Sequence, residues 1–170
     1  LVDNEGCPKE KDLDGDGVED LAIGAPRDDD GGMNRGALYI VFMNIDGTVK
    51  SKQKISSLEG NFTTLEDDAE FGCSCSSLGD HDGDGVLDIA VGARGRDDDP
   101  LAFGAVWILF LNIDGTVKAF QEISPGVGGF IGTITPSQRF GFDVEVFGDV
   151  NGDGVLDILV GAPQYTGAEV

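Results

Sequence analysis

Short apolar runs alternate along this chain with segments rich in glycine and aspartate. The longest wholly apolar run, residues 105–111, has seven residues, which suits one buried strand and is far too short to span a bilayer. The 27 glycines are more than helices tolerate and are typical of a turn-rich chain. The pattern therefore predicts an all-β protein.

One unit of this pattern recurs along the chain. The segment DLDGDGVEDLAIGAP at 12–26 returns as DHDGDGVLDIAVGA at 80–93 and as DVNGDGVLDILVGAP at 149–163. Their first aspartates stand at 12, 80 and 149, so the intervals are 68 and 69 residues. The segment NIDGTVKSKQKIS at 44–56 likewise matches NIDGTVKAFQEIS at 112–124. A fixed period of this kind is typical of repeat architectures.

The complete middle unit predicts four strands, at residues 71–78, 88–91, 104–112 and 116–123. Asp114-Gly115 between the last two strands predicts a two-residue hairpin turn in which both central residues have positive φ, and Asp46-Gly47 is its twin. Four antiparallel strands in about 68 residues make one β-propeller blade. The second and third strands are apolar on both faces, so we expect neighbouring blades to sandwich them.

The fourth strand differs from the others. Lys50, Lys52 and Lys54 share one of its faces by the two-residue period of a strand. Lysines on an outermost strand discourage edge-to-edge pairing, which accounts for them without a ligand. Phe120 replaces Lys52 in the next unit, and we expect this lone aromatic to have no docking role.

Charge narrows the possible functions. The chain has 11 basic and 32 acidic residues, a net charge of −21. Such a surface repels phosphate backbones and anionic lipid headgroups, so we expect no nucleic-acid binding and no direct membrane insertion. The acids either bind cations or form a solvated surface. Because the chain starts at Leu1 without a signal-peptide pattern, we expect it to be processed or to be part of something longer.

The repeated acidic loop has the pattern D-x-[DN]-x-D-G-x-x-D, an oxygen-only cluster that suits calcium. Alternate residues of a tight loop converge on one point, and the glycines at the sixth position, Gly17, Gly85 and Gly154, supply the sharp turn. We expect three calcium sites. Their side-chain ligands are Asp12, Asp14, Asp16 and Asp20; Asp80, Asp82, Asp84 and Asp88; and Asp149, Asn151, Asp153 and Asp157, with the backbone carbonyls of Val18, Val86 and Val155 at the seventh position.

Other interpretations of the loop are weaker. An EF-hand loop ends with an acidic residue at position 12 and leads into a helix, whereas position 12 here is Ile23, Val91 or Val160 in a β-rich run. Magnesium demands a stricter geometry than an all-protein cage of this kind provides. A plain turn kept acidic for solubility does not explain three copies at one period, each with an aspartate at the ninth position.

These residues carry a family resemblance. Phe71-Gly72, the Asp80–Asp88 loop and Gly92-Ala93 make up an FG-GAP repeat, which resembles the β-propeller of integrin α subunits. Phe140-Gly141 and Gly161-Ala162-Pro163 complete the motif again, and the first loop ends in Gly24-Ala25-Pro26. The near-identical NIDGTVK hairpins look more like FG-GAP arrays of microbial and algal secreted or surface proteins. Arg94 stands where proline is usual, and no FG pair precedes the first loop.

The resemblance implies blades of four antiparallel strands, about two and a half of them in this chain. We expect an irregular segment at 1–11, a partial first blade at 12–70 with strands two to four, a complete blade at 71–139, and a partial third blade at 140–170 with strands one and two. Seven blades usually close such a ring, so the chain is expected to be part of a longer array; self-assembly of short chains is the alternative.

In the family geometry, ligands meet the loops opposite the calcium loops. The residues expected to bind a partner there are Asp28, Asp29, Asp30, Arg96, Asp97, Asp98 and Asp99, although these acids also fit a solvated surface, and the arginines nearby could form local ion pairs with them. Asn61-Phe62-Thr63 is an N-glycosylation sequon in a predicted loop. Cys73 and Cys75 are poorly placed to bond each other; Cys7 could pair with either.

Three functions remain open. The leading one is a non-enzymatic, calcium-binding propeller segment of a secreted or cell-surface protein for adhesion or for protein or glycan recognition. The second is a structural block of an extracellular filament or coat, whose partners are further FG-GAP blades. The third is the non-catalytic propeller of a secreted hydrolase. The only histidine, His81, holds a non-ligand loop position, and no acid–base pair stands out for catalysis.

Overall fold

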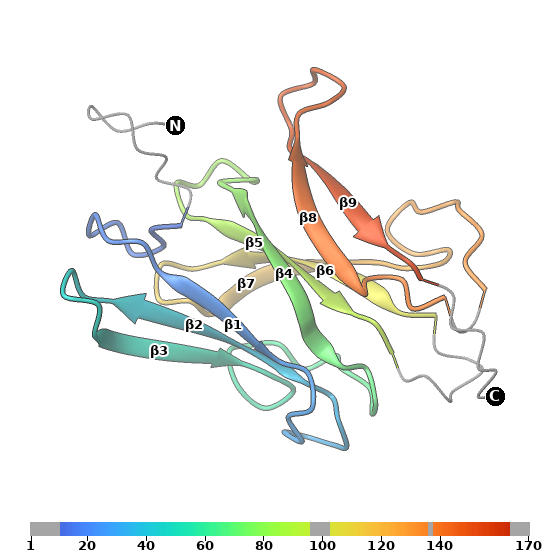
Figure 1. The fold of residues 1–170 in the computed structure, drawn as a ribbon, viewed down its shortest axis with the longest axis horizontal. Coiled ribbons are helices and arrows are strands. Elements are labelled where there is room, and N and C mark those ends of the chain that lie inside the picture. Colours follow the sequence, from blue (N-terminus) through green and yellow to red (C-terminus); the bar gives the residue numbers. More distant parts are fainter. Residues whose placement is uncertain (1–10, 96–102, 136–137, 164–170) are drawn as a thin grey trace.

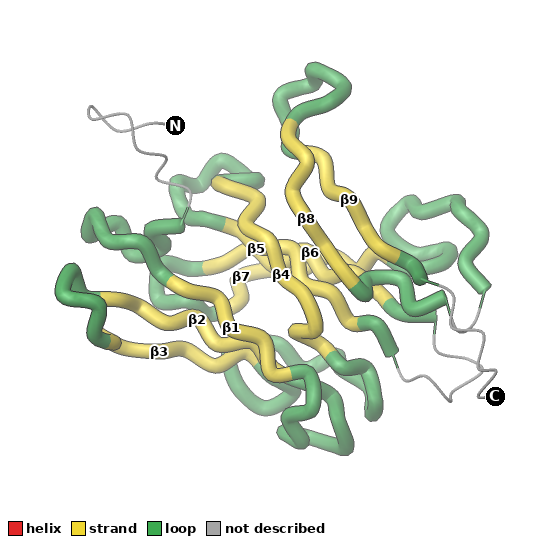
Figure 2. The backbone as a smooth tube through the Cα atoms, in the orientation of Figure 1, coloured by secondary structure: helices red, strands yellow, loops and turns green. Residues whose placement is uncertain are grey.

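The computed structural model describes residues 11–95, 103–135 and 138–163. The described residues form nine strands and no helix (Figures 1 and 2). The strands are β1 (Leu21–Ala25), β2 (Ala37–Met43), β3 (Val49–Ile55), β4 (Phe71–Gly79), β5 (Asp88–Ala93), β6 (Ala105–Leu111), β7 (Val117–Ile123), β8 (Asp143–Gly148) and β9 (Asp157–Gly161). No helix among these residues has the length and apolarity to cross a membrane.

The strands form three antiparallel sheets in chain order. The first is β1-β2-β3, the second is β4-β5-β6-β7 and the third is β8-β9. The predicted all-β fold and the four-stranded blade are confirmed, and the partial sheets hold the strands expected on either side of it. The sheets fall within the predicted ranges 12–70, 71–139 and 140–170, whose boundaries stay a prediction.

The sheets stand side by side, with β4 of the middle blade between β1 and β8 (Figure 1). The middle strands are buried on both faces: every residue of β5 is buried. Val91 and Trp107 join the apolar cluster on the side of the first sheet, whereas Ala90 and Val106 join the cluster on the side of the third. The strands that sequence places in mid-blade are therefore sandwiched as predicted.

Glycines set the spacing between neighbouring blades. A Cβ atom on Gly92 would lie 2.0 Å from the carbonyl oxygen of Gly141, and one on Gly24 would meet Gly72 in the same way. Each pair joins the glycine of strand two in one blade to the glycine after the phenylalanine of strand one in the next. Only glycine at both positions lets the two backbones approach this closely.

The hairpin turns differ from the two-residue turn that the sequence predicts. Gly47 and Gly115 have φ values of 80° and 79°, but Asp46 and Asp114 keep negative φ. Gly47 N–H donates to the carbonyl of Asn44 and Asn44 N–H donates to that of Thr48, each at 2.8 Å. The loop is therefore longer, with one left-handed residue and a bulge between Phe42 and Met43, and a single glycine is enough to close it.

Candidate metal centre

Each acidic loop is organised by the aspartate at its first position. The Asp12 carboxylate accepts the N–H groups of Gly15 at 2.8 Å and Gly17 at 2.9 Å. The equivalent bonds to the sixth-position glycine are 2.9 Å in both other loops, from Gly85 to Asp80 and from Gly154 to Asp149. The three sixth-position glycines have φ values of 88° to 89°, a backbone conformation that side-chain-bearing residues rarely adopt.

The aspartate at the ninth position ties the loop to the rest of its blade. Asp88 is 1% exposed; its carboxylate accepts the N–H of His81 in the loop at 2.9 Å and that of Leu111 at the end of β6 at 3.1 Å. Asp20 does the same with Leu13 at 2.9 Å and Met43 at 3.0 Å. Burial raises the pKa of both carboxyl groups. The sequence marks these residues as ligands and gives no sign of this second, structural role.

Carboxylates converge in the first two loops. The side chains of Asp12, Asp14 and Asp20 each offer an oxygen within 4.8 Å of the others, and those of Asp80, Asp82 and Asp88 do the same. This donor set fits a hard divalent cation, because three carboxylate oxygens meet at one point without a nitrogen or sulfur ligand. The fifth-position residues Asp16 and Asp84 do not belong to these groups.

The third loop has the same backbone frame with one change. Val150 N–H donates to Asp157 at 2.8 Å, as Leu13 donates to Asp20, but the third position is Asn151. Its amide nitrogen donates to Asp153 at 3.0 Å. The backbone N–H of each seventh-position residue donates a hydrogen bond of 2.9 Å to the fifth-position aspartate of its loop; these residues are Val18, Val86 and Val155. The individual ligand assignments in all three loops remain predictions.

Two lysines of the fourth strands reach these loops, a contact that the expected protection of the sheet edge by Lys50 does not include. Lys50 Nζ lies 2.7 Å from Asp14 and 2.6 Å from Asp16. Lys118 pairs with Asp82 and Asp84 in the next blade. The bond from each ammonium group lowers the pKa of Asp16 and Asp84, and the carboxylates raise the pKa of both lysines above its usual range.

Charged residues at the opposite ends of the strands are also paired. Lys54 Nζ lies 3.0 Å from Asp28 and 2.5 Å from Asp30. Asp29 accepts the N–H of Asn34 at 2.8 Å. The predicted partner-binding acids of the first blade are therefore largely engaged within the chain, whereas Arg96, Asp97, Asp98 and Asp99 lie outside the described residues.

Arg27 and Arg94 both form ion pairs with Glu70. Arg94 Nε lies 2.5 Å from Glu70, whose side chain is 11% exposed, and Arg27 Nε lies 4.0 Å from it. Arg94 also stacks over the Phe142 ring of the third sheet, at 5.4 Å. The residue that replaces the usual proline thus links the loop before the middle blade to the blade after it.

The remaining candidates lie as follows. Asn61 is exposed, with a φ of 62°, beside the fully buried Phe62. Cys73 and Cys75 are free and half-buried, while Cys7 lies outside the described residues. The serines of β4 join blades, a role that sequence did not suggest: Val144 N–H donates to Ser74 Oγ at 3.0 Å and Val146 N–H to Ser76 Oγ at 3.1 Å.

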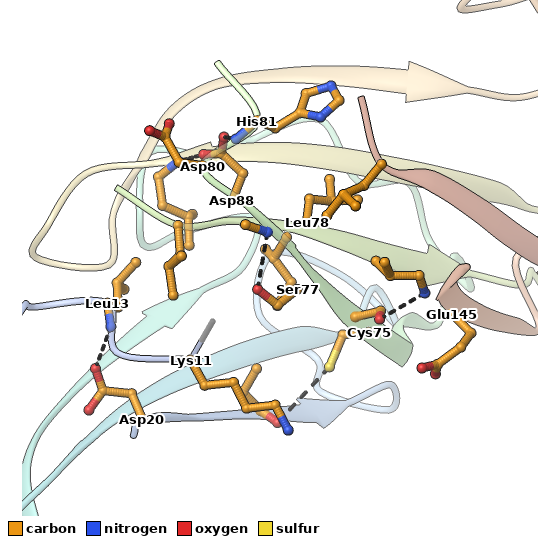
Figure 3. A pocket seen from close by; sticks show the side chains of 18 of the residues that line it. Lys11, Leu13, Asp20, Cys75, Ser77, Leu78, Asp80, His81, Asp88 and Glu145 are labelled. Carbon is orange, nitrogen blue, oxygen red and sulfur yellow. Dashed lines mark hydrogen bonds between the residues drawn. The ribbon is translucent and has the colours of Figure 1, made fainter. Parts of the chain in front are cut away.

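A groove of about 910 Å³ runs beside the two converging loops (Figure 3). Its walls come from β1, β4 and β8, and Lys11 and Glu145 line it together with Cys75 and Ser77 of β4. Asp20 and Asp88 border the same groove. The candidate cation centres therefore lie at one end of the strands, near the inner strands of the blades.

Comparison with known proteins agrees with this geometry. Residues 12–41 and 145–169 match the FG-GAP repeat family. Among similar proteins, integrin alpha-PS5 of Drosophila melanogaster is 33% identical over 161 residues and integrin alpha-5 of Xenopus laevis 34% over 155. Integrin alpha-3 of Cricetulus griseus is 35% identical over 156 residues.

These matches cover 89–90% of this chain but 13–14% of the relatives, so the chain spans about a seventh of their length. The three sheets have the strand arrangement of β-propeller blades, and the FG-GAP matches fall on the first and the third of them. Two segments of the chain match the FG-GAP repeat family, and the chain is similar to integrin α subunits over most of its length, as its sequence motifs predict.

Proposed function

We propose that the chain is a non-enzymatic, calcium-binding propeller segment of an extracellular protein, serving adhesion or the recognition of a protein or glycan. The observation that carries this proposal is the convergence of three carboxylates at equivalent positions in two successive blades. A cation would neutralise part of the repulsion among them and fix the turn between strands one and two. Calcium sites of extracellular modules bind the ion with dissociation constants of about 10⁻⁴–10⁻³ M, which suits loops of this kind.

The proposed residues at each centre are those of the acidic loops. The first-, third- and ninth-position carboxylates support direct coordination in the first two loops, because they already lie within 4.8 Å of one another. Asn151 would serve as the neutral oxygen ligand in the third loop. When bound, calcium supplies charge neutralisation and cross-linking of the loop, while the buried Asp20 and Asp88 hold the loop against strands β2 and β6.

A partner would meet the rim opposite the acidic loops. In Figure 1 the acidic loops lie along the left and upper sides of the molecule, whereas the loop after β1 lies at the bottom. The loop of residues 26–36 is braced there against residues 57–70, since Asn34 donates to Asp68 at 2.8 Å and Arg35 to Asp67 at 2.7 Å. A braced loop presents a fixed surface, which favours recognition at low entropic cost. Asn61 on this segment is the proposed glycosylation site.

The test is a thermal melt of the chain with calcium, with magnesium and with excess EDTA. We expect calcium to raise the melting temperature more than magnesium does, and EDTA to abolish the rise. Equal melting temperatures in all three buffers would contradict the proposal. The variant Asp12→Asn/Asp80→Asn, which removes one charge from each converging group, should lose most of the calcium response, and Asp46→Asn is a control outside the loops.

A second function, as a block of an extracellular filament or coat, is favoured by the third sheet. Phe147 is 58% exposed and Leu159 52% exposed on β8 and β9. Gly161 holds the place of Gly24 and Gly92, yet among the described residues the atoms nearest to an added Cβ there belong to Asp143 of its own sheet, at 3.4 Å or more. A further FG-GAP blade of this or another chain would cover this face. Concentration-dependent polymers in light scattering would favour this function; a monomer at all concentrations would contradict it.

A further inference from the structure

Two lysines enter the acidic loops in the same way in two separate sheets. Lys50 is the second residue of β3 and Lys118 the second residue of β7, each following the same NIDGTV sequence. Each ammonium group bridges the third- and fifth-position aspartates: Lys50 lies 2.7 Å from Asp14 Oδ2 and 2.6 Å from Asp16 Oδ2. Because the geometry recurs in both blades, it belongs to the repeat and not to one local accident of packing.

The lysine forms hydrogen bonds with carboxylate oxygens that a cation would need as ligands. Asp16 donates its own N–H to Asp14 Oδ1 at 3.2 Å, and its Oδ1 accepts Val18 N–H at 2.9 Å. The Oδ2 atoms of both aspartates are left for the ammonium group. Asp16 therefore points to the lysine and lies outside the group that converges with Asp12. A divalent ion that drew Asp14 Oδ2 inward would have to take it from Lys50.

The neighbouring lysines do not share this role. Lys52 lies over the Tyr39 ring at 5.3 Å. Lys54 pairs with Asp28 and Asp30 beyond the other end of the strand. The contact with the acidic loop thus belongs to the first lysine of the fourth strand alone among these three, and Lys52 offers a matched control on the same strand.

We propose that Lys50 and Lys118 are exchangeable counter-cations of the acidic loops. Each ammonium group holds the third- and fifth-position carboxylates together while no divalent ion is bound, and it gives them up when one binds. The exchange sets the calcium affinity, because the ion must displace a cation that is already in place. In the free protein the ammonium group reduces the repulsion between the two carboxylates and so keeps the loop folded. This inference rests on the proposed calcium sites.

The experiment compares the wild-type chain with Lys50→Met/Lys118→Met and with Lys52→Met, by calorimetric titration with calcium chloride and by melting in EDTA. Methionine keeps most of the side-chain length and removes the charge. We expect the double variant to bind calcium roughly tenfold more tightly at two sites, since one positive charge near a divalent ion is lost. In EDTA it should melt below the wild type. Lys52→Met should leave the calcium affinity unchanged.

These two readouts separate the outcomes. If the lysines only stabilised the fold, their replacement would lower both the calcium affinity and the melting temperature. Weaker or unchanged calcium binding by the double variant would therefore overturn the proposed exchange. If wild type and double variant both fail to bind calcium, the proposed function falls as well. Binding by the double variant alone supports both proposals. The single variant Lys118→Met repeats the test if the double variant does not fold in EDTA.

Discussion

The carbonyl oxygen of Gly72 lies only 1.8 Å from the position that a Cβ atom on Gly24 would occupy. A methyl group at that point forces the first two blades apart. We expect Gly24→Ala and Gly92→Ala each to lower the free energy of unfolding by about 3 kcal/mol, as overpacking of a close contact does. Urea denaturation of each variant measures the loss.

Gly161 is the matched control, because it has the same place in the third repeat. An alanine there would meet Asp143 of its own sheet at ordinary contact distance. Gly161→Ala should therefore change the stability of this chain by less than about 0.5 kcal/mol. Equal losses at positions 24 and 161 would show that alanine acts on the strand itself and not on the contact between blades.

Most of the fold follows from the sequence for a simple reason. Three copies of one pattern impose the same local structure three times, so strand order, blade composition and the burial of β5 and β6 can be predicted from a single unit. The hairpin turn cannot, because Asp-Gly is compatible with several loop lengths. Its type depends on a bulge next to Met43 that the sequence does not mark.

The candidate site is less predictable for a different reason. The spacing of the acidic residues indicates a metal site, but nothing in the sequence links Lys50 to it, because Lys50 is 34 residues from Asp16 and 36 from Asp14. Whether it reaches the loop depends on the register of β3 relative to β1, which a two-residue pattern leaves open. The same holds for Ser74, whose hydroxyl meets Val144 only after two blades have docked.

Phe62 comes from a polar loop and packs between blades. Its ring centroid lies 5.1 Å from that of Phe71, 5.2 Å from Trp107 and 5.2 Å from Phe120, and its side chain is fully buried. We expect Phe62→Ala to cost about 3–5 kcal/mol, the usual loss for a buried phenylalanine. The substitution should also shift the fluorescence of Trp107, the only tryptophan, toward the red in the native state.

Phe130 provides the comparison in the next loop. Its ring stacks on Phe140 at 5.0 Å, but it is only half-buried among the described residues. Phe130→Ala should thus cost clearly less than Phe62→Ala. Similar costs would contradict the interpretation that contact with Trp107 and Phe120, and not with the FG phenylalanine alone, makes Phe62 important.

The two thiols of β4 should be slow to react. Burial raises the pKa of Cys73 and Cys75, and Cys73 Sγ lies 3.2 Å from the carbonyl oxygen of Gly141 in the next blade. Because the thiolate is the reactive form, alkylation at pH 8 should proceed slowly at both residues. Peptide mapping after iodoacetamide treatment measures each site, and urea-unfolded protein is the control. Alkylation at the unfolded rate would contradict the burial of these groups.

The pair between Asp30 and Lys54 predicts a pH dependence of stability. The hydrogen bond from Lys54, followed by that from Ser56, lowers the pKa of Asp30 below its ordinary value of 3.8. A carboxyl group whose folded pKa is lowered stabilises the native state above its unfolded pKa, and this contribution is lost as the pH falls through the folded pKa. We expect Asp30→Asn to lower the melting temperature at pH 7, and this effect to shrink as the pH falls below the ordinary carboxyl pKa of 3.8.

Asp29→Asn tests whether the lysine is the cause. Asp29 accepts a backbone N–H from Asn34, which an asparagine oxygen can also accept, and Lys54 is paired with its two neighbours instead. The control variant should therefore track the wild type across the whole pH range. The measurement is a series of melts in EDTA between pH 2.5 and pH 7, so that cation binding does not contribute. A gap between wild type and Asp30→Asn that keeps the same size from pH 7 to pH 2.5 would assign the effect to the shape of the side chain and not to its charge.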